Sequence, residues 1–154
     1  MIIRKATLDD MELLIKLRID YLLDESKVKS LDDIDKIKSD LYDYFNKWIP
    51  NKGCIAFFAE ENDEVLSTAF LSIVERPPRK ATSSNLVGTV YNVFTYPMYR
   101  KQGIATKIML KLIEEAKSLN VASLDLLATA SGKSLYERLG FSQIDNYTSM
   151  RMKI

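Results

Sequence analysis

The feature that most constrains this chain is a strand-forming run, residues 86–96, followed at once by a basic turn and an amphipathic helix. Pro97 ends the run, because proline has no N–H group to donate to a sheet. The turn carries Arg100, Lys101 and Gly103. The first N–H groups of a helix lack partners within the helix, and the helix N-terminus carries partial positive charge. Glycine lets a ligand approach the backbone closely, so this strand–turn–helix unit predicts a site for a phosphate-bearing cofactor.

Length and composition indicate one domain, residues 1–154, with 47% hydrophobic residues to build a core. The 22 basic residues are balanced by 21 acidic ones, for a net charge of +1. A nucleic-acid-binding protein would show a strongly basic face, so we expect no nucleic-acid partner. The N-terminus becomes polar too soon for a signal peptide, and no apolar run is long enough to span a bilayer. We therefore expect a cytoplasmic protein without a membrane partner.

Histidine is absent from the sequence, and this excludes several kinds of chemistry. Ser-His-Asp and Cys-His catalysis, H-E-x-x-H zinc sites and four-ligand Cys/His zinc sites all require it. No acidic motif demands a divalent cation, so no metal is predicted. Cys54 is the only cysteine, so it has no disulfide partner in the chain, and we expect it to be a small buried residue. Any chemistry must use hydroxyl, carboxylate, amine, guanidinium or backbone groups.

Hydrophobic periodicity and turn signals divide the rest of the chain into short strands and helices. Helix N-caps are predicted at Thr7, with Asp10 three residues later, and at Ser30. A hairpin turn is predicted at Asn62-Asp63. Strands are expected at residues 2–6, 54–60, 65–75, 86–96, 123–128, 141–144 and 149–153, and helices at 8–22, 30–48, 104–119 and 131–139. The resulting order, βααβββαβαββ, predicts a mixed α/β (α+β) domain.

Two motifs give the chain a family resemblance. The spacing Arg100-x-x-Gly103-x-Ala105 resembles the acyl-CoA signature R/Q-x-x-G-x-G/A of the GNAT superfamily of N-acyltransferases. The late segment 132–141, which reads GKSLYERLGF, resembles that family's Leu-Tyr-x-x-Leu-Gly-Phe motif. The resemblance covers essentially the whole chain. It implies a GNAT-like fold, with a central twisted and mostly antiparallel sheet of six to seven strands flanked by about four helices.

The resemblance also implies an activity. It identifies the chain as an acetyl-CoA-dependent N-acetyltransferase that moves an acetyl group to a primary amine by direct attack within a ternary complex. Acetyl-CoA would be the co-substrate, with no metal, and the acceptor would be a small-molecule amine or a peptide amine. A homodimer is possible, since dimers are common in the family. The alternative is a non-catalytic acyl-CoA-binding regulatory module that has kept the cofactor turn and lost turnover.

Roles for individual residues follow from the same resemblance. Tyr136 would protonate the departing thiolate, and its position fits, because it is offset by about 100° from the seam formed by Leu135 and Leu139. A backbone N–H near Phe94 or Thr95 would stabilise the oxyanion, so Thr95 joins Tyr136 as a catalytic residue. The central strand would carry a bulge and splay from residues 124–128, admitting the pantetheine arm. The residues implied to bind the cofactor are Val93, Phe94, Thr95, Arg100, Lys101, Gln102, Gly103, Ile104, Ala105, Thr106, Ser131, Lys133 and Tyr136.

Two positions depart from the family pattern. Many members have an asparagine before the late helix, where this chain has Ser131. Many also have a glutamate on the central strand that acts as general base, where this chain has Tyr91 and Asn92. The base is therefore open between a water chain, Tyr91 and Glu75. These two departures are also what favours the regulatory alternative.

The acceptor side of such a fold is built from the first two helices and the loop before the central strand. Here it is rich in acidic and tyrosine side chains, contributed by Asp20, Tyr21, Asp24, Glu25 and residues 40–44. This acidity weakly favours a cationic acceptor, although exposed helices are commonly acidic.

Overall fold

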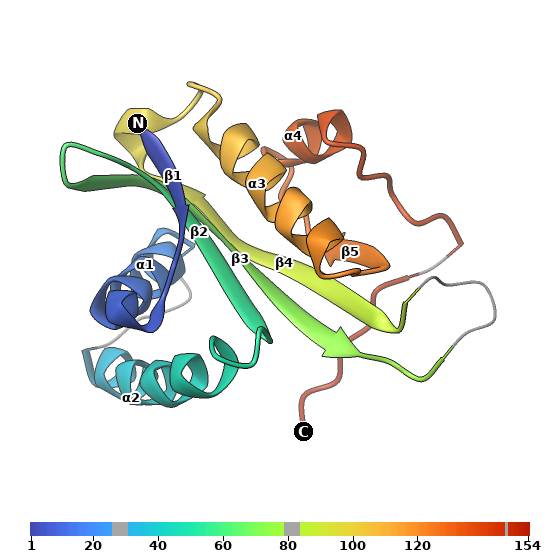
Figure 1. The fold of residues 1–154 in the computed structure, drawn as a ribbon, viewed down its shortest axis with the longest axis horizontal. Helices are drawn as coiled ribbons and strands as arrows, with labels where there is room; N and C mark the ends of the chain where they lie inside the picture. Colours follow the sequence, from blue (N-terminus) through green and yellow to red (C-terminus); the bar gives the residue numbers. More distant parts are fainter. Residues whose placement is uncertain (26–30, 79–83, 147) are drawn as a thin grey trace.

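A twisted five-stranded sheet with two helices on each face forms the described part of the chain (Figure 1). The structure is a computed structural model that describes residues 1–25, 31–78, 84–146 and 148–154. In chain order the elements are β1 Ile2–Lys5, η1 Leu8–Asp10, α1 Met11–Asp24, α2 Leu31–Trp48, β2 Cys54–Glu61, β3 Glu64–Glu75, β4 Leu86–Thr95, η2 Pro97–Tyr99, α3 Ile104–Ser118, β5 Ser123–Leu126 and α4 Lys133–Arg138. The strands lie in sequence order; β1 to β4 are antiparallel, and β5 is parallel to β4.

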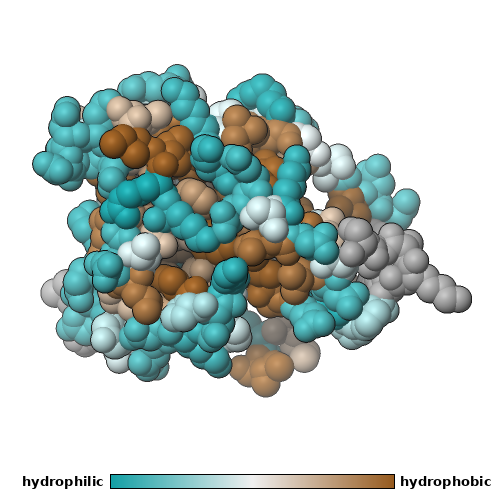
Figure 2. Space-filling model, viewed as in Figure 1, coloured by the Kyte–Doolittle hydropathy of each residue, from teal (hydrophilic) through white to brown (hydrophobic). Residues whose placement is uncertain are grey.

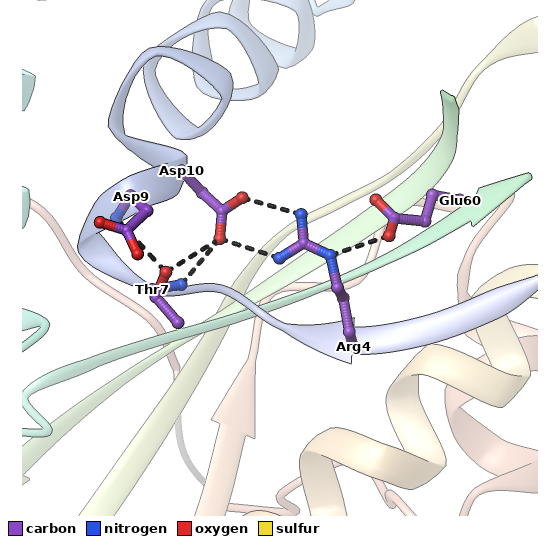
Figure 3. Close-up of polar contacts among 5 residues, drawn as sticks. All are labelled: Arg4, Thr7, Asp9, Asp10 and Glu60. Atoms are coloured by element: carbon purple, nitrogen blue, oxygen red, sulfur yellow. Dashed lines mark hydrogen bonds and ion pairs between the residues drawn. The ribbon is translucent and has the colours of Figure 1, made fainter. Parts of the chain in front are cut away.

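The predicted cap at Thr7 is confirmed at the start of the first helical segment (Figure 3). The Thr7 hydroxyl accepts a hydrogen bond from the Asp9 backbone N–H, and the Asp10 carboxylate accepts one from the Thr7 N–H at 2.9 Å. Arg4 on β1 joins this cap to the sheet. Its Nη1 and Nη2 atoms donate to Asp10 at 2.9 and 2.8 Å, and its Nε donates to Glu60 of β2 at 2.8 Å. The entry of α1 is thus fixed against the sheet edge.

The predicted hairpin between β2 and β3 is also confirmed. Asn62 and Asp63 have φ angles of 52° and 64°. Two consecutive residues with positive φ are characteristic of the type I′ turn, whose twist matches that of the strands it joins. Asparagine and aspartate tolerate this left-handed region better than most residues, which explains why the chain turns here.

The two faces of the sheet have separate hydrophobic cores. On one face α1 and α2 bury Leu14, Leu17 and Phe45 against strand residues such as Phe58 and Phe70. On the other face α3 buries an apolar stripe that includes Ile108, Met109 and Leu112, and α4 packs at its margin. Figure 2 shows the molecular surface from the same side as Figure 1, with apolar residues in its middle and hydrophilic residues around them. The sheet is therefore the only layer between the two pairs of helices in the described residues.

β4 carries a bulge at Asn92, as the family resemblance implies. Thr68 pairs with Phe94 but Phe70 pairs with Tyr91, so β4 has one more residue than β3 over this stretch. Asn92 has a φ of 53°, in the left-handed region. Pairing of β4 with β5 ends at Val90 and Leu126, immediately before the bulge. Because a bulge bends its strand, the last part of β4 runs on without β5 beside it.

Two sequence predictions about strands are wrong. β5 ends at Leu126 and not at residue 128, because the bulge removes its partner. The predicted hairpin of residues 141–144 and 149–153 is not formed, so the sheet has five strands in the described residues instead of six or seven. Ile144, Met150 and Met152 are 62%, 90% and 80% exposed. With so little apolar burial, nothing offsets the entropy lost when a strand is ordered.

The remaining expectations concern a helix cap, membrane spans and metal ligands. The Ser30 cap lies outside the described residues. None of the described helices is both long and apolar enough to cross a membrane. Among the described residues, no three acidic or cysteine side chains are gathered as ligands for a metal ion.

Candidate active site

The turn before α3 is shaped to receive an anion. Lys101 and Gly103 have φ angles of 61° and 74°, so two residues of the turn, separated by Gln102, are left-handed. Turn conformations of this kind direct successive backbone N–H groups toward one anion. Gly103 occupies the N-cap position of α3, and no side chain caps the helix there. A Cβ atom at Gly103 would meet no heavy atom within 4 Å, so the space before the helix is open. The first turn of α3 contains no acidic residue, which leaves its positive end uncompensated.

The other residues predicted to bind the cofactor around this turn take ordinary helical or turn positions. Ile104 is buried in the core and anchors the first turn of α3, and Ala105 and Thr106 follow it, half-buried. The Gln102 side chain donates from Nε2 to the Met98 carbonyl at 3.2 Å, which braces the turn from within. An ordered turn of this kind would present its amides without much rearrangement.

Arg100 connects the turn to two other parts of the molecule. Its Nε donates to the Thr95 carbonyl at 2.9 Å, so the end of β4 sets the position of the side chain. Its Nη2 lies 3.1 Å from both carboxylate oxygens of Asp24, the last residue of α1. The guanidinium also lies 5.9 Å from the centre of the Phe94 ring. The Arg100 cation is therefore held at the junction of α1, β4 and α3.

The end of β4 has one edge that faces no strand in the described residues. The Tyr96 N–H donates to Leu66 of β3, and the Phe94 carbonyl accepts from Ser67 of β3 at 2.8 Å. Backbone groups alternate sides along a strand, so those of Thr95 point away from β3. The Arg100 bond to the Thr95 carbonyl agrees with this direction. Of the two predicted oxyanion donors, the Thr95 N–H lies on the open edge and the Phe94 N–H faces β3.

The side chains of this segment are fixed by their neighbours. The Ser67 hydroxyl proton goes to the Phe94 carbonyl, so at the 2.7 Å contact between Ser67 and Thr95 the Thr95 hydroxyl is the donor. The Phe94 ring packs edge-on against Tyr21 and Tyr96, on the α1 face. Val93 packs on the opposite face, against the core under α3. The side chains beside the open edge thus have defined partners, and the Thr95 hydroxyl is already engaged.

Tyr136 lies on α4, on the face of the sheet that α3 covers. Its ring packs at the margin of the α3 core and contacts Phe141 edge-on, with the ring centres 6.0 Å apart. Burial, together with the negative charge of Glu25 at the end of α1, raises the pKa of the Tyr136 hydroxyl. Burial and a hydrogen bond to Glu25 likewise raise the pKa of Tyr21 to about 12. Tyr136 and Glu25 therefore lie near each other, although α4 and α1 pack on opposite faces of the sheet.

The remaining predicted cofactor residues lie in the turn before α4 and at its start. The Ser131 hydroxyl lies 3.2 Å from that of Thr129, whose oxygen accepts the Gly132 N–H. Lys133 is exposed and forms a loose ion pair with Glu137 at 3.8 Å. Lys133 and Tyr136 also line a cavity of about 900 Å³ enclosed by α3, β5, α4 and the C-terminal segment. No residue of the α3 turn lines this cavity, so it is separate from the anion site.

The structure distinguishes the candidates for general base. The Tyr91 hydroxyl lies 3.1 Å from that of Tyr44 and 3.3 Å from Cys54 Sγ, inside the core under α2. Burial raises the pKa of Tyr91 far above its ordinary value, so it would not accept a proton as phenolate. Glu75 pairs with Leu86 at the other end of β4 from the bulge. Neither residue lies on the open edge of β4, and a water chain remains the alternative.

The acidic residues of the acceptor side mostly have cationic or hydroxyl partners. Asp20 accepts hydrogen bonds from the Tyr96 hydroxyl and from Lys16 Nζ, the latter at 2.6 Å. Asp24 is paired with Arg100. Two of the acidic side chains that suggested a cationic acceptor, Asp20 and Asp24, are therefore matched by cations within the protein.

Sequence reasoning missed one polar pair at the bulge. Arg18, on the face of α1 that covers β4, donates from Nη1 to Asn92 Oδ1 at 3.2 Å. Its guanidinium lies 5.4 Å from the ring centre of Tyr21 and 5.6 Å from that of Tyr91. In the sequence, Arg18 is only one member of a helical stripe. The positive φ of Asn92 could have been suspected from its residue type alone.

Comparison with known proteins agrees with this geometry. The model of the Acetyltransferase (GNAT) family matches residues 19–141. This match spans most of the chain and includes the last residues of α1, the bulged strand, the turn, α3 and Tyr136. The chain therefore belongs to the GNAT family of acetyltransferases. Comparison of the sequence with curated proteins gives no match.

Solved structures with the same fold span a range of sequence identities. A predicted acetyltransferase from Clostridium acetobutylicum, crystallised with acetyl-CoA, is 31% identical with a TM-score of 0.85, and the match covers 97% of this chain and 95% of that one. A GCN5-related N-acetyltransferase from Ralstonia eutropha JMP134 is 21% identical, with a TM-score of 0.77 and 97% of both chains covered. Glucosamine-6-phosphate N-acetyltransferase from Arabidopsis thaliana is 17% identical, with a TM-score of 0.71 and coverage of 99% and 98%. The last two share the fold.

Proposed function

We propose that this protein transfers an acetyl group from acetyl-CoA to a primary amine, by direct attack within a ternary complex. The observation that carries the proposal is the continuity of three features. The open edge of β4 begins at the bulge and ends at the basic turn and N-terminus of α3, and Tyr136 would lie beside this edge. A thioester cofactor with a phosphate-bearing end would contact these features in this order.

The residues present fit such a cofactor. The amides of residues 101–106, together with Arg100 and Lys101, would hold the pyrophosphate, because helix N-termini and cationic side chains both favour anions. The space in front of Gly103 leaves room for it. The pantetheine arm would lie along residues 93–95, on the edge without a strand neighbour, with its amides bonding to the backbone as an added strand does. Ser131 and Lys133 would flank it from the α4 side.

When bound, acetyl-CoA supplies the thioester carbonyl that the amine attacks. The Thr95 N–H would stabilise the negative charge that develops on the carbonyl oxygen, which is an established use of backbone donors. The new bond joins the amine nitrogen to the acyl carbon, and the bond from that carbon to sulfur breaks. Tyr136 would donate its hydroxyl proton to the sulfur as it leaves. The raised pKa of Tyr136 keeps this proton in place throughout the neutral range.

The ammonium proton of the acceptor must also be removed before attack. Glu25 is the carboxylate whose charge reaches Tyr136, and it follows α1 on the acceptor side. We infer that Glu25, directly or through water, is a better candidate for this role than Tyr91 or Glu75. The fold alone does not identify the acceptor, since a protein that shares it is a glucosamine-6-phosphate N-acetyltransferase.

Calorimetric titration with acetyl-CoA tests the proposal, with a Gly103→Glu variant beside the wild type. We expect binding to the wild type and none to the variant, whose carboxylate would occupy the place of the phosphate. Thiol release over a panel of amines then tests transfer. Binding without turnover on any amine would favour the non-catalytic alternative, and no binding would refute both.

A further inference from the structure

We propose that Arg18 and Asn92 bind a carboxylate group of the acceptor, so that the substrate is an amine that also carries a carboxylate, such as an amino acid. This inference rests on the proposed function, because it concerns the acceptor of that reaction. The evidence for it is that, at the β4 bulge, some polar groups of this pair have hydrogen-bond partners among the described residues and others have none.

Asn92 has a buried donor that no described residue accepts from. The side chain lies in the core at 1% exposure, on a residue held at a φ of 53°. Its Oδ1 accepts from Arg18, and this bond fixes which end of the amide faces the guanidinium. Nδ2 is left with no hydrogen-bond partner among the described residues. Buried donors in folded proteins are nearly always paired, so an orphan donor at a strained position of a catalytic strand indicates a ligand.

Arg18 carries a positive charge that is not matched by a carboxylate among the described residues. It contacts two aromatic rings and one neutral amide, and no ion pair joins it to a carboxylate in the described ranges. The neighbouring cations on this side differ, since Lys16 is paired with Asp20 and Arg100 with Asp24. The described contacts thus leave the charge of Arg18 itself to be matched. An arginine that is partly buried and unpaired is the preferred partner of a planar carboxylate.

The pair lies in the right place for an acceptor. Arg18, Tyr21 and Glu25 recur every three or four residues, so they share the face of α1 that covers the bulge. Glu25 is at the end near Tyr136, and Arg18 is one to two turns further back. An acceptor whose amine reaches the thioester would thus direct its other end toward Arg18. One guanidinium and one neutral amide provide a single positive charge, which matches a carboxylate better than a phosphate dianion.

Nitrogen-15 NMR of the CoA-saturated protein tests the binding without need of turnover. The side-chain amide signal of Asn92 is followed while amino acids, dipeptides and the matched amino-acid amides are added, with glucosamine 6-phosphate as the phosphate-bearing amine. We expect at least one carboxylate compound to shift the Asn92 signal and its amide analogue to leave it unchanged. A shift with the phosphate alone, or with no compound, would overturn the proposal.

Kinetics with the acceptor found in this way provides the second test. Arg18→Gln should raise KM for the carboxylate acceptor about ten- to one-hundred-fold, as expected for loss of a charged hydrogen bond. KM for the amide analogue should be unchanged, which a merely structural role would not produce. Asn92→Gly tolerates the positive φ and removes the donor, and Asn92→Asp also places a competing carboxylate beside Arg18. Both should reduce the preference for the carboxylate acceptor.

Arg151→Gln, in the exposed C-terminal segment, is the matched control and should behave as the wild type. All variants should retain acetyl-CoA binding by calorimetry, which separates failure of this inference from failure of the proposed function. Unchanged selectivity in variants that fold and bind acetyl-CoA would refute the role of the pair.

Discussion

Arg100, in the basic turn before α3, is paired with Asp24 of α1, with Nη2 3.1 Å from both carboxylate oxygens. The two residues are 76 positions apart in the sequence, and they join the predicted phosphate site to the helix that borders the acceptor. A phosphate at the turn would compete with Asp24 for the same guanidinium. Cofactor binding and the position of the end of α1 would thus be linked through the Arg100 side chain.

Replacing Asp24 should therefore strengthen cofactor binding. Both partners are about half exposed, and such ion pairs contribute roughly 0–1 kcal/mol. We expect Asp24→Asn to lower the Kd for acetyl-CoA by up to about five-fold at low salt, with a smaller gain at high salt because screening weakens the competing pair. Calorimetry at two ionic strengths measures this. Asp35→Asn, which breaks an exposed ion pair on α2, is the control; weaker binding to Asp24→Asn would contradict the competition.

Gly103 should be intolerant of side chains for two separable reasons. Its φ of 74° makes any L residue strained by about 1–2 kcal/mol, and a charge there would enter the anion site. Gly103→Ala should lose stability in urea and keep part of its acetyl-CoA affinity, whereas Gly103→Glu should lose binding altogether. Asn120→Glu, at a φ of 57° just beyond the other end of α3, introduces the same side chain away from the site. If that variant also lost binding, strain and not charge would be the cause.

Tyr136 should matter for turnover more than for binding. Tyr136→Phe retains the ring that packs on Phe141 and removes the proton donor. We expect kcat to fall roughly one-hundred-fold, within the range of general-acid effects, while the Kd for acetyl-CoA changes little. Because the pKa of Tyr136 is raised, the wild-type rate should lose this contribution only when the pH exceeds the ordinary tyrosine pKa of 10.0.

The control for this measurement is Tyr99→Phe, which removes an exposed hydroxyl bonded to Glu64. It should leave kcat and the pH profile unchanged. If Tyr136→Phe had a normal kcat, Tyr136 would not be the general acid, and the proton would come from solvent.

The elements that could be predicted from sequence are those determined by local chemistry. The Thr7 cap, the Asn62-Asp63 turn and the strand–turn–helix unit at Gly103 each depend on residues within a few positions of one another. The end of β5 could not be predicted, because it depends on a bulge more than 30 residues earlier in the chain. The C-terminal hairpin failed for a related reason. Met150, Met152 and Ile154 alternate as in a strand, but alternation does not supply a partner or a core.

The site divides in the same way. Arg100, Gly103 and Tyr136 could be proposed because motif spacing and helix termini are visible in the sequence. The partners of these residues could not, since Asp24, Glu25 and their neighbours on α1 reach the site only through tertiary packing. Arg18 and Asn92 are 74 residues apart, and nothing in either segment indicates that one would contact the other.

The ion pair of Arg4 with Asp10 should make stability depend on pH in a defined direction. The hydrogen bond from Arg4 lowers the pKa of Asp10 in the folded protein below the ordinary 3.8. A lowered pKa contributes stability above the unfolded value, and this contribution is lost as the pH falls through the folded one. Asp10→Asn should cost about 1–2 kcal/mol at neutral pH, for the cap and the partly exposed pair together.

Urea unfolding at neutral pH and well below 3.8 measures this effect (Figure 3). The difference between wild type and Asp10→Asn should shrink at the acidic pH. Asp9→Asn, at the adjacent position, should be nearly neutral at both. A constant difference across the range would mean that the charge of Asp10 contributes nothing.

Cys54 should be unreactive in the folded protein. It is 1% exposed, its Sγ lies 3.3 Å from the Tyr91 hydroxyl, and burial raises the pKa of its thiol. Because the thiolate is the reacting species, we expect a disulfide reagent such as DTNB to leave the native protein unmodified and to label one thiol in urea. Cys54→Ala should give no signal in either state. Rapid labelling of the native wild type would show that the core under α2 opens. Slow or absent labelling means that thiol released in an acetyl-transfer assay comes from CoA alone, so the same reagent can report turnover without a background from the enzyme.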